Sequence, residues 1–167
     1  MELPFQIVEK ESFKVLGYRI ETTNKKQEGR KKIPECWNTF RNSSQQEILM
    51  SRKTQEPYGL FGISEYNIDS EDARRFAYYI GISSSDEMEG DLVSYTVPKQ
   101  TWAIFPCTMD TMGKVQVQAI TKWLPKSKYV PLNKGYITGK MKSGAPDIEC
   151  YLNEDGDAQV WIAVSEK

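Results

Sequence analysis

Hydrophobic and polar residues alternate with a period of two over several stretches of this chain, which is typical of β-strands that bury one face. The alternation is clearest in residues 147–152, DIECYL, where every second residue is apolar. A carboxylate, Glu149, therefore lies in mid-strand on the face opposite the apolar residues, together with Asp147 and Tyr151. This face is either in contact with solvent or the lining of a cleft.

The first half of the chain contains the elements of one α+β unit. Gly17 interrupts an early strand-like run, which indicates a bulge or a close approach of two strands. Pro34 is expected near the first turn of a helix, where the missing N–H does no harm. The predicted elements are extended segments within 5–22, a polar and basic loop at 24–32, a helix over about 33–50 and two strands within 58–67 and 75–83.

The second half repeats this order of strand, helix, strand, strand. Pro98 divides the strand-like run 92–108 into two pieces, and a helical pattern over 115–127 ends at Pro125. The last two strands, 147–152 and 159–166, form a hairpin across a turn that contains Asp-Gly. We therefore predict one domain of two similar halves, about 1–88 and 89–167, with a groove at their junction. The long loop 131–146 is a candidate lid or binding element.

Composition restricts the possible chemistry. The chain has 167 residues, 39% of them hydrophobic, and a formal net charge of −1, which gives no general attraction to nucleic acid or to an anionic membrane. It has no histidine, which excludes Ser-His-Asp and Cys-His catalysis. Three widely spaced cysteines and no CxxC pair favour a reducing compartment and disfavour a zinc site. No leader pattern or membrane-length apolar run is evident, so we expect a cytoplasmic protein without a metal or cofactor.

Five motifs in a fixed order make the sequence resemble a known family. The chain resembles the GyrI-like effector-binding domains, which are fused to AraC-type and MerR-type transcription activators or stand alone. Its helix motif and its early strand most resemble the integron-cassette effector-binding proteins of that superfamily. The motifs are IPECWNTF (33–40), YGLFGIS (58–64), TWAIFPC (101–107), ITKWLPKS (120–127) and DIECYL (147–152).

The resemblance implies a fold and a site. The implied fold is α+β, a duplicated βαββ unit whose two antiparallel-sheet halves form a central ligand cleft lined by aromatic rings. Drug-binding members carry a glutamate near the bottom of this cleft that meets hydrophobic cations, and Glu149 occupies that place here. The aromatic residues that the resemblance assigns to the cleft are Trp37, Trp102, Phe61 and Tyr79.

Each of these residues also has a purely structural interpretation. Glu149 could be a solvated strand residue, and Trp37 lies at a helix spacing typical of core packing. Trp102 stands in a strand where core and cleft are both open. Tyr78 and Tyr79 are neighbours on one strand and must point to opposite faces, so at most one of them lines a given cleft.

Three functions compete at this point. The first is a stand-alone, multidrug-type binding protein for hydrophobic, preferably cationic, small molecules, which acts in transcription through a separate partner and has no direct contact with nucleic acid or membrane. The second, suggested by stand-alone GyrI-like hydrolases, is an enzyme that opens cyclopropane-bearing DNA-alkylating compounds with Glu149 as the base. The third is docking onto a larger enzyme. We favour binding, because a desolvated carboxylate among aromatic rings selects for lipophilic cations.

Overall fold

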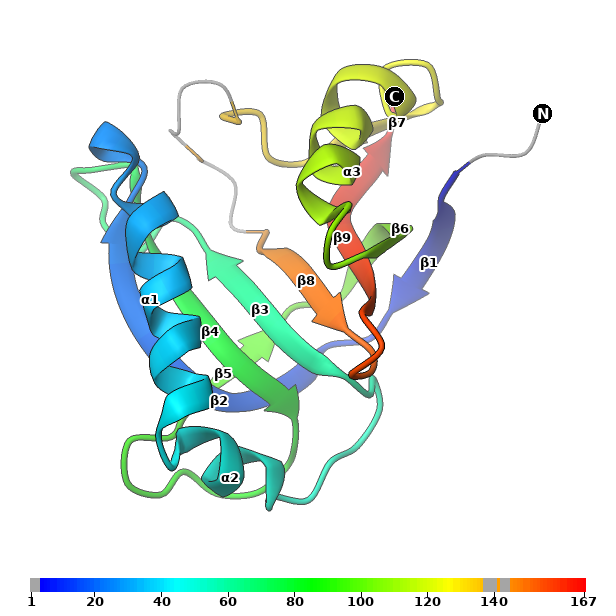
Figure 1. Cartoon of the computed structure of the whole chain (residues 1–167). Coiled ribbons are helices and arrows are strands. Elements are labelled where there is room, and N and C mark those ends of the chain that lie inside the picture. The colour runs from blue at the N-terminus through cyan, green and yellow to red at the C-terminus, as the bar shows by residue number, and fades with distance from the viewer. Residues whose placement is uncertain (1–3, 137–140, 142–144) are drawn as a thin grey trace.

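The structure is a computed structural model, and it describes residues 4–136, 141 and 145–167. These residues form one large antiparallel sheet with helices on one of its faces (Figure 1). The elements in chain order are β1 (Gln6–Lys10), β2 (Phe13–Thr23), η1 (Lys25–Gln27), α1 (Gly29–Asn42), α2 (Gln45–Met50), β3 (Leu60–Glu65), β4 (Arg75–Ser83), β5 (Val93–Val97), β6 (Gln100–Thr108), α3 (Met112–Gln118), η2 (Ala119–Trp123), β7 (Tyr129–Pro131), β8 (Asp147–Tyr151) and β9 (Asp157–Glu166).

The strand order shows the predicted duplication. Strands lie in the order β1-β6-β9-β8-β3-β4-β2-β5, and β7 pairs with β9. The series β2-α1-β3-β4 and β6-α3-β8-β9 have the same order of elements, and they meet where β3 pairs with β8. The strand before each series pairs with the first strand of the other series. Thus β1, which precedes β2, pairs with β6, and β5, which precedes β6, pairs with β2. The α+β fold with a duplicated βαββ unit is therefore confirmed, and the exchanged strands were not predicted.

Alternation along the strands divides the interior between the two faces of the sheet. On the helix side, Tyr78 and Ile80 of β4 pack beneath α1, and Val160 of β9 packs beneath α3. The opposite face has its own core around Trp161. The sheet curls around this second core, since the ring of Phe13 on β2 lies 6.4 Å from the ring of Trp161 although three strands separate β2 from β9.

The first helical region differs from its prediction. Residues 25–27 form the short turn η1, in which Lys26 and Gln27 have positive φ, and α1 begins at Gly29. The predicted loop at 24–32 is therefore wrong for its last four residues, where Gly29 lies against the ring of Phe76. The predicted helix over 33–50 is divided, because Ser43 has an extended conformation between α1 and α2.

Other boundaries agree more closely with the sequence. Strands β4, β5, β6 and β8 occupy the predicted runs, and Pro98 lies in the break between β5 and β6. Gly17 marks the predicted close approach, because a side chain there would overlap the backbone of Ile80. The helix predicted over 115–127 begins at Met112 and continues as the π-helical turn η2.

Two predictions concern the segments around the last hairpin. Part of the candidate lid 131–146 lies outside the described residues, which resume with Ala145. The turn between β8 and β9 contains Gly156 with φ 98°, a conformation that favours glycine.

Within the described ranges, no helix is long and apolar enough to cross a membrane.

Candidate functional site

A cavity of about 260 Å³ lies on the helix side of the sheet, at the junction of the two repeated series. Strands β3 and β8 pass between α1 and α3 at this junction (Figure 1). Both helices and both central strands contribute side chains to the wall. The described lining consists of Asn24, Ile33, Ser64, Tyr66, Phe76, Gln116, Ile120, Tyr136, Asp147, Ile148, Glu149, Val160 and Ile162.

Strand β8 brings two carboxylates to this cavity. Asp147 and Glu149 are two residues apart, so the alternation of the strand directs both toward the helix side, while Ile148 and Cys150 join the core of the opposite face. Both carboxylates are half-buried. The mid-strand glutamate thus lies in the wall of a cavity rather than on an open surface.

Asp147 is held by two phenols. Tyr66 donates a hydrogen bond to Oδ2 at 2.7 Å, and Tyr136 donates one to Oδ1 at 2.8 Å. Burial raises the pKa of this carboxyl to about 6, although side-chain hydrogen bonds from Tyr66, Tyr136 and Asn133 lower it. Asp147 is therefore mainly ionised at neutral pH and becomes protonated in mildly acidic solution.

Glu149 has a similar environment. The hydroxyl of Tyr151 donates a hydrogen bond of 2.6 Å to its Oε2. Burial raises the pKa of Glu149, the hydrogen bond from Tyr151 opposes this rise, and the nearby charge of Asp147 adds to it. The two carboxylates therefore interact electrostatically across the cavity that they share.

The rest of the described wall is largely apolar. Ile33, Phe76, Ile120 and Val160 supply hydrocarbon, and no Lys or Arg is present among the described residues that line the cavity. Ionised carboxylates without a cationic partner are costly to desolvate. A ligand that brings positive charge and an apolar body would satisfy both parts of this wall.

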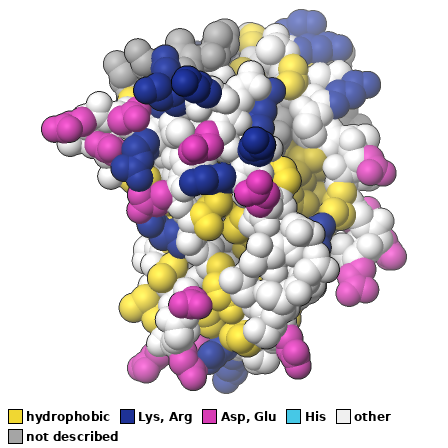
Figure 2. All heavy atoms as spheres, turned by 60° about the vertical axis from the view of Figure 1, so that its left-hand side comes forward, with side chains coloured by type: hydrophobic (Ala, Val, Ile, Leu, Met, Phe, Trp, Pro, Cys, Tyr) yellow, Lys and Arg dark blue, Asp and Glu magenta, His cyan; other side chains and the backbone are white. Residues whose placement is uncertain are grey.

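The charge inside the cavity differs from that on the neighbouring surface. Figure 2 shows Lys and Arg side chains gathered in the upper part of the face that turns the left-hand side of Figure 1 forward, with Asp and Glu among them. The exposed basic residues of η1 and of the first turn of α1 are Lys25, Lys26, Arg30, Lys31 and Lys32. The negative charge of the cavity is thus local and does not reflect the charge of the whole face.

Trp37 lies beside this site. It is buried on α1, and its indole Nε1 donates a 2.9 Å hydrogen bond to the hydroxyl of Tyr78. Its ring also meets the ring of Tyr151 edge to face, with centroids 5.1 Å apart. Since Tyr151 holds Glu149, the structure brings Trp37 and Glu149 together through one intermediate side chain.

Gly62 makes the floor of this region possible. It pairs with Glu149 across the β3–β8 ladder, and a side chain at this position would overlap the hydroxyl of Tyr78.

A second hollow of about 380 Å³ is lined by Trp37, Tyr151 and Arg41, among others, and the guanidinium of Arg41 lies 5.2 Å from the centre of the Trp37 ring. Arg41 therefore belongs to this second hollow, whose described lining shares no residue with that of the cavity at Glu149.

Three other predicted residues point away from this cavity. Trp102, Phe61 and Tyr79 belong to the core on the opposite face of the sheet. The hydroxyl of Tyr79 donates to Glu65 at 2.7 Å. These residues do not meet Glu149, because they lie on the face opposite the helices. Sequence alternation shows which residues share a face, but it does not show which face the helices cover.

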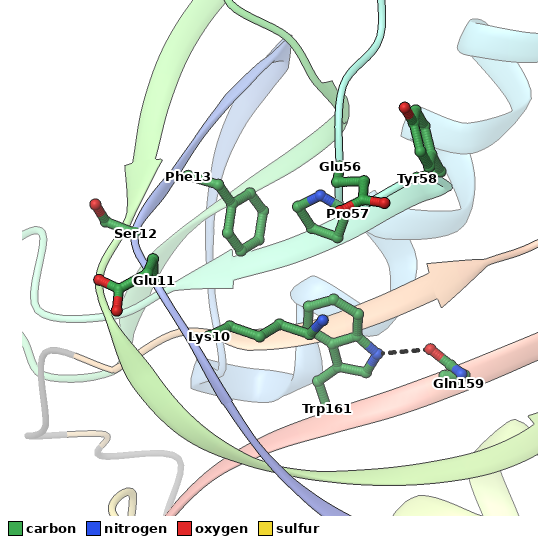
Figure 3. Close-up of a pocket in the computed structure, with 9 residues that line it drawn as sticks. All are labelled: Lys10, Glu11, Ser12, Phe13, Glu56, Pro57, Tyr58, Gln159 and Trp161. Atoms are coloured by element: carbon green, nitrogen blue, oxygen red, sulfur yellow. Dashed lines mark hydrogen bonds between the residues drawn. The ribbon is translucent and has the colours of Figure 1, made fainter.

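The opposite face has a cavity of its own, which Figure 3 shows in close-up. Its volume is about 590 Å³, and Phe13, Pro57 and Trp161 supply its apolar surface. The ammonium of Lys10 lies 5.1 Å from the centre of the Trp161 ring, and the indole N–H of Trp161 donates to Gln159. A cation of the protein already covers this aromatic face, so the smaller cavity at Glu149 is the better candidate for a cationic ligand.

Several residues of the site were not among the predicted ones. Asp147 could have been found, because the alternation that exposes Glu149 places Asp147 on the same face. Tyr66 directly follows β3, and Tyr136 lies in the segment after β7. Both donate hydrogen bonds to Asp147, and no local sequence signal shows that these segments meet.

Comparisons with known proteins agree with this fold. A family model described as integron-associated effector binding protein matches residues 6–164. No curated protein sequence matches the chain.

Solved structures show the same fold at low identity. SAV2435 bound to tetraphenylphosphonium has 15% identity and a TM-score of 0.75, with 99% of this chain and 94% of that chain covered. The integron cassette protein VCH_CASS2 from the mobile metagenome of Vibrio cholerae has 16% identity and a TM-score of 0.65, with 96% and 95% covered. The C-terminal domain of EcmrR, a protein also solved in complex with DNA, has 13% identity and a TM-score of 0.56, with 98% and 99% covered.

Proposed function

Because the chain belongs to the family of integron-associated effector-binding proteins, we propose that it binds lipophilic cationic small molecules in the cavity at Glu149. The observation that carries the proposal is a wall with two half-buried carboxylates, apolar side chains and no described Lys or Arg. Such a wall favours a positive ligand over a neutral or negative one, since the ligand replaces the lost hydration of the carboxylates.

The wall of the cavity supports a ligand that carries an apolar body. Ile33, Phe76 and Ile120 supply hydrocarbon beside the two carboxylates. The tetraphenylphosphonium bound by SAV2435 is a compound of this class, a single positive charge within an apolar shell. We propose Glu149 as the main counter-ion and Trp37 as part of the apolar wall.

The test is calorimetric titration with two ions of the same shape and opposite charge. We expect tetraphenylphosphonium to bind saturably and tetraphenylborate to bind at least about tenfold more weakly, because the carboxylates repel an anion. Equal binding of the two ions would indicate a site that recognises only apolar surface and would refute the proposal.

A hydrolase is the second candidate function, and one contact favours it. Glu149 has a raised pKa and accepts a 2.6 Å hydrogen bond from Tyr151, so a base and a hydrogen-bond donor lie together at the cavity. Chromatography after incubation with a cyclopropane-bearing alkylator distinguishes the two functions. Intact compound supports binding without turnover, whereas loss of the compound that depends on Glu149 would establish an enzyme.

A role in transcription is part of the proposal. The described elements belong to the two repeated series, their exchanged strands and the short elements that join them, so we propose that any effect on transcription passes through a cytoplasmic partner that reads the ligand-bound state. Purification from the native host with and without tetraphenylphosphonium tests this step. A partner retained in only one of the two conditions would support the proposal, and retention independent of the ligand would contradict it.

A further inference from the structure

We infer that the cavity selects ligands with two positive centres, one for Glu149 and one for Asp147. This inference rests on the proposed function and specifies the class of ligand. The chemical class is a compact dication with an apolar spacer, in which the centre that meets Asp147 carries N–H donors. The proposal therefore gives Asp147 a role in specificity in addition to that of Glu149.

The spacing of the two carboxylates fits such a ligand. Asp147 and Glu149 line the same cavity from alternate positions of one strand, so their backbones are about 7 Å apart. This separation corresponds to a small rigid spacer between two positive groups. Apolar side chains of α1, β4 and η2, represented by Ile33, Phe76 and Ile120, face the space that the spacer would occupy.

Among the residues that the structure describes, the lining of the cavity does not balance its negative charge. This lining includes two carboxylates and no cationic side chain. Arg41 lines the separate hollow, where its guanidinium lies over the ring of Trp37. A monocation would compensate one carboxylate and leave the other without a counter-ion, whereas a dication compensates both.

A buried acceptor next to Asp147 indicates the nature of the second positive group. Asn133 is 1% exposed, and its side chain lies close enough to Asp147 to lower the pKa of that carboxyl. Its Nδ2 donates to the carbonyl of Ala145 at 3.0 Å, but its Oδ1 accepts no hydrogen bond from the described residues. Buried oxygen atoms are rarely left without a donor. An ammonium at Asp147 would bring N–H donors to this cluster of acceptors.

A matched pair of amines tests the inference. The dication is 1,4-bis(aminomethyl)benzene, and the control is 4-ethylbenzylamine, in which a methyl group replaces one ammonium. We expect the dication to bind about tenfold more tightly than the monocation in calorimetric titrations of the whole chain at pH 7.5. In Asp147→Asn this advantage should fall to less than about twofold.

A second measurement does not depend on the folding of a variant. The ratio of the two affinities for the wild type should decrease between pH 7.5 and pH 5, as protonation removes the charge of Asp147. Equal affinities of the two amines at pH 7.5, an advantage that survives in folded Asp147→Asn, or no binding of either amine while tetraphenylphosphonium binds would each overturn the inference. Failure of tetraphenylphosphonium to bind would instead refute the proposed function.

Discussion

The affinity of the protein for a lipophilic cation should depend on pH near neutrality, which is unusual for a carboxylate site. Free carboxylic acids titrate near pH 4, but burial raises the pKa of Asp147 to about 6. A cation binds the ionised form, so its affinity is fully present above this pKa and is lost as the pH falls through it. The groups that face this carboxyl are the phenols of Tyr66 and Tyr136, the amide of Asn133 and the nearby Glu149.

The magnitude follows from the ionised fraction. With a pKa of about 6, Asp147 is about nine-tenths ionised at pH 7 and about one-tenth ionised at pH 5. If its charge is required for binding, the association constant for tetraphenylphosphonium should fall by about tenfold over this range, and the raised pKa of Glu149 adds a further loss at the acidic end.

The assay is a series of calorimetric titrations at half-unit steps from pH 7.5 to pH 5. Triphenylphosphine oxide is the neutral control, and its affinity should not change with pH. In Asp147→Asn the fall near pH 6 should disappear and leave only the more acidic contribution of Glu149. An affinity for the cation that is constant between pH 7 and pH 5 in the wild type would refute the assignment of charge to this site.

Three further predictions concern the site and its support. The folded-state pKa of Asp147 lies above its unfolded value, so this group makes folding more favourable as the pH falls from 7 toward 4. In urea titrations, the unfolding free energy of the wild type should therefore rise by up to about 3 kcal/mol relative to that of Asp147→Asn over this range. Gly62→Ala should destabilise the fold by about 1–3 kcal/mol because its Cβ overlaps the hydroxyl of Tyr78, whereas Gly113→Ala, which meets open space in α3, should be neutral or stabilise by up to about 1 kcal/mol; similar effects of the two would contradict the packing argument. Tyr79→Phe should keep the affinity for tetraphenylphosphonium within about twofold, since Tyr79 lies on the opposite face, and a large loss would place the ligand there instead.

The strands of this fold could be predicted because their pattern is local. Alternation in β8 correctly assigns Asp147 and Glu149 to one face, and alternation in β4 separates Tyr78 from Tyr79. The repeated order of elements was visible for the same reason. The start of α1 at Gly29 was not visible, because the basic segment before Ile33 has no apolar periodicity, and the contact of Gly29 with Phe76 joins segments distant in sequence.

The location of the site required the three-dimensional structure. Both faces of the central strands are covered, so alternation alone does not show which face lies under the helices. The resemblance assigns Trp102 and Phe61 to the cleft, and the structure places them in the core of the face opposite Glu149. The significance of Asp147 depends on phenols from two segments distant in sequence, and no local pattern shows this contact.

Glu149→Gln tests the central claim most directly, because it removes the charge of the proposed counter-ion with little change in shape. The measurement is a calorimetric titration of wild type and variant with tetraphenylphosphonium and with neutral triphenylphosphine oxide at pH 7.5. We predict a loss of more than about tenfold for the cation and nearly unchanged binding of the neutral compound. Equal losses for both compounds, or no loss for the cation, would contradict the role of Glu149 as the counter-ion.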